Sequence, residues 1–302
     1  MRLEGDRLHI GERVAISFQR TLRLPDDGRE YPLPPGLGRF QVRSAAAYAE
    51  LPVSWHNDFL IPMYPREALW LGFDAVEWKP NVVKVGVGGI DAVSGEAWND
   101  GLGTNPQNYL VVPDQPWLDG INSGGGTVRQ FVAMPLGLGL TVEAELTGAE
   151  RTGGIQLAVY EPVPGRFPDT APPRPPHAVI TLAEPQAMGL GAGGVMRQKI
   201  YPDPYGVATW DPASVVTVFV RLLSVSAYCA ITGEPAPGSP VDAEAYTQAG
   251  LPWFELDDRT ESAVAAAEAL ARVRSIRELE GRPAEPGVEV SDTQRRVLRR
   301  EI

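Results

Sequence analysis

Apolar and polar residues alternate along residues 1–257, in short runs that Gly and Pro interrupt. This period-two pattern predicts half-buried β-strands, because successive side chains of a strand point to opposite faces. Turn formers recur at a rhythm that is typical of antiparallel sandwiches and jelly rolls. We therefore expect an all-β fold, an antiparallel β-sandwich of jelly-roll type. The clearest expected strands lie at 8–24, 109–112, 128–134, 140–146, 155–160, 178–182, 215–223 and 226–232.

The pattern changes at Asp258, where strong helix formers replace the alternating runs. Asp258 and Glu261 match a helix N-terminal cap, and Gly281 and Pro283 predict the helix end. A single apolar stripe on such a helix must be buried, so we expect it to dock on the β body or on a partner. The stripe consists of Ala266, Leu270, Val273, Ile276 and Leu279.

A short basic helix is expected after a cap at Ser291 or Asp292. Its positive charge stands against an acidic molecule, so it is a candidate for contact with another protein or a second subunit. A solvated helix end is the other interpretation. The arginines concerned are Arg295, Arg296, Arg299 and Arg300.

A proline-rich stretch at 161–177 is the best candidate for a domain boundary, because proline fixes φ and removes a hydrogen-bond donor. Residues 1–160 are predicted to form a β-rich domain, and 161–177 a loop or linker. Residues 178–257 add strands to the same sandwich or form a second small β domain. Residues 258–302 form the C-terminal helices and tail.

Charge and cysteine usage exclude several classes of function. The net charge of −11 disfavours nucleic acid, which attracts positive surfaces. No apolar run is long enough to span a bilayer, and no secretory signal is recognisable at the N-terminus. The single cysteine, Cys229, is expected in a buried strand and fits a reducing compartment, so we predict a cytoplasmic protein.

Motifs for cofactors, metals and catalysis are weak. The run GLGAGG at 189–194 matches a dinucleotide fingerprint, but prolines follow where a helix should begin, so a flexible glycine loop is expected. The three histidines, His9, His56 and His177, are scattered, so neither a metal nor a cofactor is predicted. No nucleophile elbow occurs, and no pair of acids can be chosen for glycosidic chemistry. The sequence favours a protein that is not an enzyme.

Three tryptophans, Trp55, Trp98 and Trp117, have Asp or Asn neighbours. Rings with polar neighbours can form a platform for a sugar or another flat ligand, although buried core rings explain most tryptophans. The acids of this hypothetical site are Asp58, Asp100, Asp114 and Asp119.

Two functions remain as hypotheses. The first is a non-catalytic β-sandwich protein that acts by self-assembly or by binding another protein, with the C-terminal helix and basic tail as docking element. The second is a jelly-roll protein that binds, and could act on, a carbohydrate or another small ligand in a cleft lined by Trp, Asp and Asn.

Overall fold

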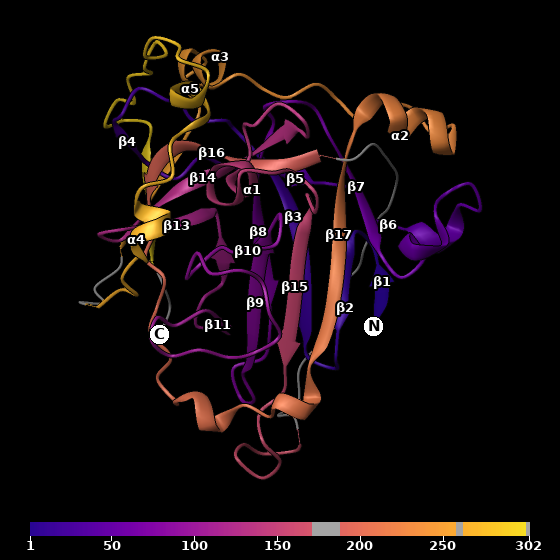
Figure 1. Cartoon of the computed structure of the whole chain (residues 1–302). Coiled ribbons are helices and arrows are strands. Elements are labelled where there is room, and N and C mark those ends of the chain that lie inside the picture. The colour runs from indigo at the N-terminus through magenta and orange to yellow at the C-terminus, as the bar shows by residue number, and fades with distance from the viewer. Residues whose placement is uncertain (171–187, 258–261, 300–302) are drawn as a thin grey trace.

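A computed structural model describes residues 1–170, 188–257 and 262–299 (Figure 1). It is mostly β-structure, paired largely in antiparallel fashion, with few and short helices, which confirms the predicted all-β class. The expected strand at 178–182, the helix cap at 258–261 and Arg300 lie outside the described residues.

The strand pairings fall into two series. One series runs β1–β2–β3–β8–β14–β16, with β5 on β3, β12 on β8, β13 on β14 and β4 on β16. Its strands are β1 (Arg2–Glu4), β2 (Arg7–Ile10), β3 (Val14–Thr21), β4 (Glu30–Tyr31), β5 (Gly36–Arg39), β8 (Ala68–Asp74), β12 (Trp117–Leu118), β13 (Gly120–Gly124), β14 (Thr127–Pro135) and β16 (Met188–Arg197).

The second series runs β9–β15–β17–β7–β6, with β10 and β11 on β9; its central strands lie side by side in Figure 1. The pairing Met188↔Leu222 joins it to the first series. Because β15 pairs with both β9 and β17, strands from before and after the proline-rich segment share this sheet. Its strands are β6 (Arg43–Ser44), β7 (Phe59–Met63), β9 (Asn81–Val87), β10 (Ile90–Asp91), β11 (Leu110–Val112), β15 (Ile155–Tyr160) and β17 (Val216–Ser224).

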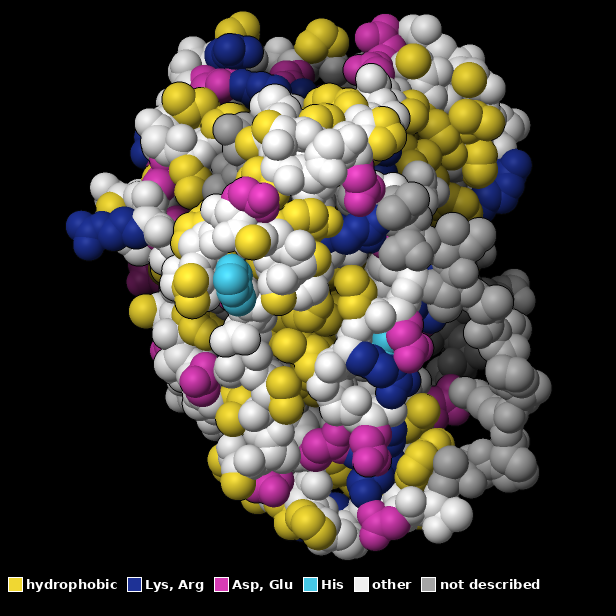
Figure 2. All heavy atoms as spheres, turned by 90° about the vertical axis from the view of Figure 1, so that its right-hand side faces the viewer, with side chains coloured by type: hydrophobic (Ala, Val, Ile, Leu, Met, Phe, Trp, Pro, Cys, Tyr) yellow, Lys and Arg dark blue, Asp and Glu magenta, His cyan; other side chains and the backbone are white. Residues whose placement is uncertain are grey.

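Alternating apolar side chains of both series meet in one large core cluster, which includes Phe18, Leu71, Val85, Leu157 and Val220. Burial of this apolar surface is the main force that holds the two series together. On the face shown in Figure 2, Lys and Arg side chains lie directly beside Asp and Glu. Surface ion pairs of the described residues include Arg7 with Asp74, at 2.9 Å.

Two expected strands are helices. The segment expected as a strand at 140–146 contains α1 (Val142–Thr147), because the Thr141 side chain accepts a hydrogen bond from Ala144 N and Gly148 ends the helix at a φ of 73°. The segment 226–232 forms α2 (Val225–Thr232), which Gly233 ends at a φ of 69°. Cys229 is therefore half-buried in a helix and not in a buried strand.

The glycine run at 189–194 is a buried strand, β16, and not a flexible loop. A Cβ on Gly191 would lie 2.6 Å from Leu140 O and 2.8 Å from Ile276 Cγ1. A Cβ on Gly194 would lie 2.6 Å from Pro25 O. Glycine is needed here because neighbouring backbone approaches closely.

The long C-terminal helix predicted from residue 258 is absent from the described part, 262–299. Only α4 (Glu268–Ala271) and α5 (Ile276–Leu279) are helical, and the Ser275 capping box starts a new helix where the predicted one would continue. The apolar stripe nevertheless docks on the β body of its own chain: Leu270 and Val273 join the main core, and Leu279 packs against the small cluster that contains Ile276. The remaining helices are α3 (Ala243–Gln248) and the 3₁₀ turns η1 (Ala45–Ala47), η2 (Val53–Trp55), η3 (Val207–Thr209) and η4 (Pro212–Ser214).

The predicted basic helix is also wrong. Residues Arg295–Arg299 form strand β19, parallel to β18 (Trp253–Asp257), and Arg295 is registered with Trp253. Helix propensity is a weak prior, and here pairing with β18 overrides it.

Candidate functional site

Three adjoining hollows surround β18 and β19, and we call them together the tail groove. The main hollow, of about 540 Å³, lies between β4, β16 and the β18–β19 pair. A second hollow of about 450 Å³ shares Glu30, Tyr31, Pro32 and Arg295 with it. A smaller hollow of about 160 Å³ beside Trp117 shares Gln198, Lys199 and Leu256 with it. Because the three hollows share lining residues, they adjoin one another around the β18–β19 pair.

β19 is an edge strand that is paired on one side among the described residues. Trp253 N donates to Gln294 O, and in a parallel ladder this directs the amides of Arg296 and Leu298 toward β18. The N–H and C=O of Val297 therefore point away from β18. The Val297 side chain is 60% exposed and that of Leu298 is 39% exposed.

Aromatic packing anchors this small sheet to the body. Trp253 is fully buried, with its ring centroid 6.4 Å from those of Tyr31 and Tyr246. Leu33 and Phe254 exchange backbone hydrogen bonds of 2.8 and 3.0 Å, which tie β18 to the chain after β4. The buried Gln294 side chain donates to Thr247 O and Leu251 O. The wall of the groove that β18 and β19 form is thus firmly attached.

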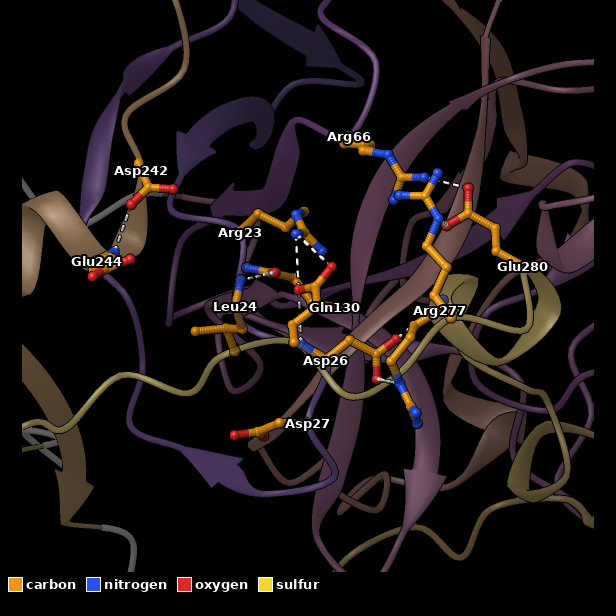
Figure 3. Close-up of polar contacts among 12 residues, drawn as sticks. Arg23, Leu24, Asp26, Asp27, Arg66, Gln130, Asp242, Glu244, Arg277 and Glu280 are labelled. Carbon is orange, nitrogen blue, oxygen red and sulfur yellow. Dashed lines mark hydrogen bonds and ion pairs between the residues drawn. The ribbon is translucent and has the colours of Figure 1, made fainter.

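An ion pair and a hydrogen bond fasten α5 and the segment after it to the loop after β3 (Figure 3). Arg23 donates to both carboxylate oxygens of Glu285 at 2.8 Å. Asp26 accepts from Arg277 N at 3.2 Å. Burial raises the pKa of Glu285, but hydrogen bonds from Arg23 and the Asp26 amide outweigh this, and the net pKa is lowered. The segment therefore holds its position at neutral pH, where Glu285 is ionised.

A buried polar cluster lies beneath the Trp117 hollow. Trp117 Nε1 and Gln198 Nε2 each donate to Asp119 Oδ2 at 2.7 Å, and Gln198 Oε1 accepts from Asp119 N at 2.9 Å. Burial raises the pKa of Asp119 to about 7, although the bond from Trp117 opposes the rise. Gln198 lines the groove, so this cluster connects the groove to the interior.

Asp119 gives the stability a pH dependence that we expect to be measurable. Its folded pKa lies above the unfolded value of about 3.9, so this group stabilises the fold below the unfolded pKa. That contribution is lost as pH rises from about 4 to about 7, and no further loss follows above that range. In Asp119→Asn the Asn oxygen can accept both hydrogen bonds, so urea midpoints across this range should fall less than in the wild type. Parallel pH profiles of the two proteins would contradict the assignment.

The three tryptophans of the predicted ligand site lie in three different hydrophobic clusters. The Trp55 ring lies 3.9 Å from the Arg221 guanidinium, and Arg221 in turn binds Asp58 at 2.6 Å. Trp98 packs over Gly86. Of the three tryptophans, Trp117 is the one that lines the groove.

The predicted acids are also dispersed. Asp58 is buried against Arg221, and Asp119 is buried beneath Trp117. Asp100 is exposed, and its backbone carbonyl accepts from the Tyr160 hydroxyl. Asp114 is half-buried in the chain between β11 and β12. Of the predicted site residues, Trp117 and Asp119 are joined by a hydrogen bond and Trp117 lines the small hollow, while Arg295 lines the two larger hollows.

Sequence reasoning missed most of the groove. The lining residues Tyr31, Arg197, Lys199 and Phe254 come from three segments that lie far apart along the chain. The sequence feature that could have indicated the groove is the C-terminal segment, where apolar Val297 and Leu298 are flanked by arginines.

Within the described ranges, no group of three or more His, Cys, Asp or Glu side chains is placed to hold a metal ion. None of the described helices combines the length and apolar character needed to cross a bilayer. No protein-family model matches the chain, and no similar curated protein or solved structure was found.

Proposed function

We propose that this chain is a non-catalytic protein-binding protein, and that β19 binds an extended segment of another protein by strand addition. The observation that carries the proposal is an edge strand with outward-facing backbone groups at Val297, whose residues Arg295 and Leu298 line the hollows of the groove. Open edges with exposed apolar side chains are templates for strand pairing unless they are protected. Main-chain hydrogen bonds would supply affinity, and the hollows would accept side chains.

The edge lacks the usual protection at its centre. Charged side chains and proline protect natural edge strands, and β19 has arginines at its ends, Arg295, Arg296 and Arg299, but apolar Val297 and Leu298 between them. The apolar stripe docks within the chain, so in this proposal β19 and the groove, rather than Leu270 and Val273, contact the partner.

We also propose a cytoplasmic location for the protein, because a single cysteine fits a reducing compartment.

Panning a library of short peptides on the purified full chain tests strand addition. Val297→Pro removes the outward N–H without touching the ladder to β18, and proline is tolerated on edge strands. Val297→Thr keeps the N–H and serves as the matched control. We expect peptides that bind the wild type and Val297→Thr to bind Val297→Pro about tenfold more weakly. The variant loses the hydrogen bond from the N–H at position 297, and the proline ring adds bulk at the strand edge. Equal binding to all three proteins would exclude strand addition.

A small-ligand site is the second candidate, because Trp117 lines a hollow that shares lining residues with a larger polar one. A ligand on this ring would change tryptophan fluorescence, and Trp117→Phe would abolish the change. A glycan panel that leaves the emission of the wild type unchanged, while peptides bind, would leave strand addition as the function.

A further inference from the structure

We infer that the segment taken up by β19 is acidic and carries one large apolar side chain, which enters the hollow beside Trp117. This inference rests on the proposed function and adds the chemistry of the partner. It follows from the charges along β19, from the shape of the small hollow and from the register of β18 with β19.

The charges along β19 favour an acidic partner. Arg296 is exposed, and its guanidinium donates to the backbone carbonyls of Thr293 and Arg295. Arg295, on the opposite face of the strand, pairs with Glu255 and is still 40% exposed. Cross-strand neighbours of opposite charge stabilise a pair of strands. An acidic residue opposite either arginine would gain such a contact.

The same charges argue against a second copy of β19 as the occupant. Pairing of two β19 strands would bring the arginines of both copies together, and like charges directly opposite each other are destabilising. The partner therefore differs from this strand in charge.

The hollow beside Trp117 fits one large apolar side chain. It measures about 160 Å³, and an apolar cavity of about 150 Å³ holds a benzene ring. Its apolar walls are Pro116, Trp117, Tyr201, Leu256 and Leu298.

The register of β18 with β19 places the hollow beside the open edge of β19. Leu256 and Leu298 are directly registered and point to the same face of the small sheet. The next strand beyond β19 would place a side chain beside Leu298 on that face, about 5 Å away. That side chain would lie at the mouth of the hollow.

Three synthetic peptides of one length test the inference. The first alternates Glu with Val and has one central Phe, the second replaces each Glu by Lys, and the third replaces the Phe by Ser. We expect fluorescence polarisation to show the first binding at least about tenfold more tightly than either other peptide, because a charge contact or a buried ring is lost. Salt should weaken the first peptide most, since exposed charges are screened.

Two variants test which residue of β19 causes the preference for acidic peptides and which causes the preference for Phe. Arg296→Glu should remove the preference for Glu over Lys. Leu298→Ser should reduce the preference for Phe over Ser, and the fold should tolerate it because Leu298 is partly exposed. Leu138→Ser is the matched control, since Leu138 is 60% exposed and lines none of the three hollows.

The outcomes separate this inference from the proposed function. Equal binding of the Glu and Lys peptides, with Val297→Pro still weakening both, would overturn the acidic partner and leave strand addition intact. Equal binding of the Phe and Ser peptides would overturn the role of the hollow. A wild-type dimer in light scattering that Val297→Pro converts to monomer would make a second copy the occupant and overturn the inference.

Discussion

Gly191→Ala should lower the free energy of unfolding by about 2 kcal/mol, in the range of overpacked cores. The added Cβ would lie 2.6 Å from the backbone oxygen of Leu140, and a backbone atom cannot move aside as a flexible side chain can. It would also lie 2.8 Å from Ile276 Cγ1, so the docking of α5 should loosen as well. Urea denaturation followed by tryptophan fluorescence measures the loss.

Gly36→Ala is the matched control. Gly36 also lies in a strand, but a Cβ there meets Trp70 at an ordinary 3.4 Å. Because alanine reduces the freedom of the unfolded chain, this variant should be as stable as the wild type or slightly more stable. If Gly191→Ala behaves like Gly36→Ala, the close packing described for β16 is incorrect.

Lys84→Met should cost about 3 kcal/mol, the largest single effect that we expect. Lys84 Nζ is buried, donates to Asn99 O at 2.9 Å and Gly101 O at 2.6 Å, and lies 3.8 Å from Asp91 Oδ2. Its distance from the Trp98 ring centroid is 5.3 Å. Methionine fills the volume but removes the donor to Asn99 O and leaves the buried Asp91 without a counter-charge, whereas Gly101 O keeps the bond from Asn108 Nδ2 at 3.1 Å.

A double-mutant cycle with Asp91→Asn tests this explanation. Asn can keep the bonds that Asp91 Oδ1 accepts from Val93 N and Ser94 N, while removing the charge. We expect Lys84→Met/Asp91→Asn to be more stable than the sum of the two single changes predicts, because no isolated charge remains in the double variant. Strictly additive losses would show that the two groups do not interact.

The strands were predictable where alternation is long. Residues 128–134, 155–160 and 215–223 each lie in strands near the expected bounds, since both faces of such segments must match the layers they contact. The strand predictions for residues 140–146 and 226–232 are wrong, because a short apolar run does not distinguish a strand from a helix. Local caps at Thr141 and left-handed glycines at Gly148 and Gly233 decided the outcome.

The candidate site was predictable only in fragments. Trp117 and Arg295 are predicted for different reasons: β12 brings Trp117 to the groove, and the register of β18 with β19 brings Arg295 there. That register depends on pairing between segments about forty residues apart, which local propensity cannot encode. The glycine run at 189–194 was misread for a similar reason, because the backbone that presses on it comes from elsewhere in the chain.

The parallel pairing of β18 with β19 has a consequence for when the groove can exist during synthesis. One wall comes from Glu30 to Leu33 and another from Arg295 to Leu298, so two segments far apart in the chain must both be in place. The main core as described includes no residue after Val273, so it can form before β19 is synthesised. In the proposed function, binding of a partner would have to wait until β19 has paired with β18.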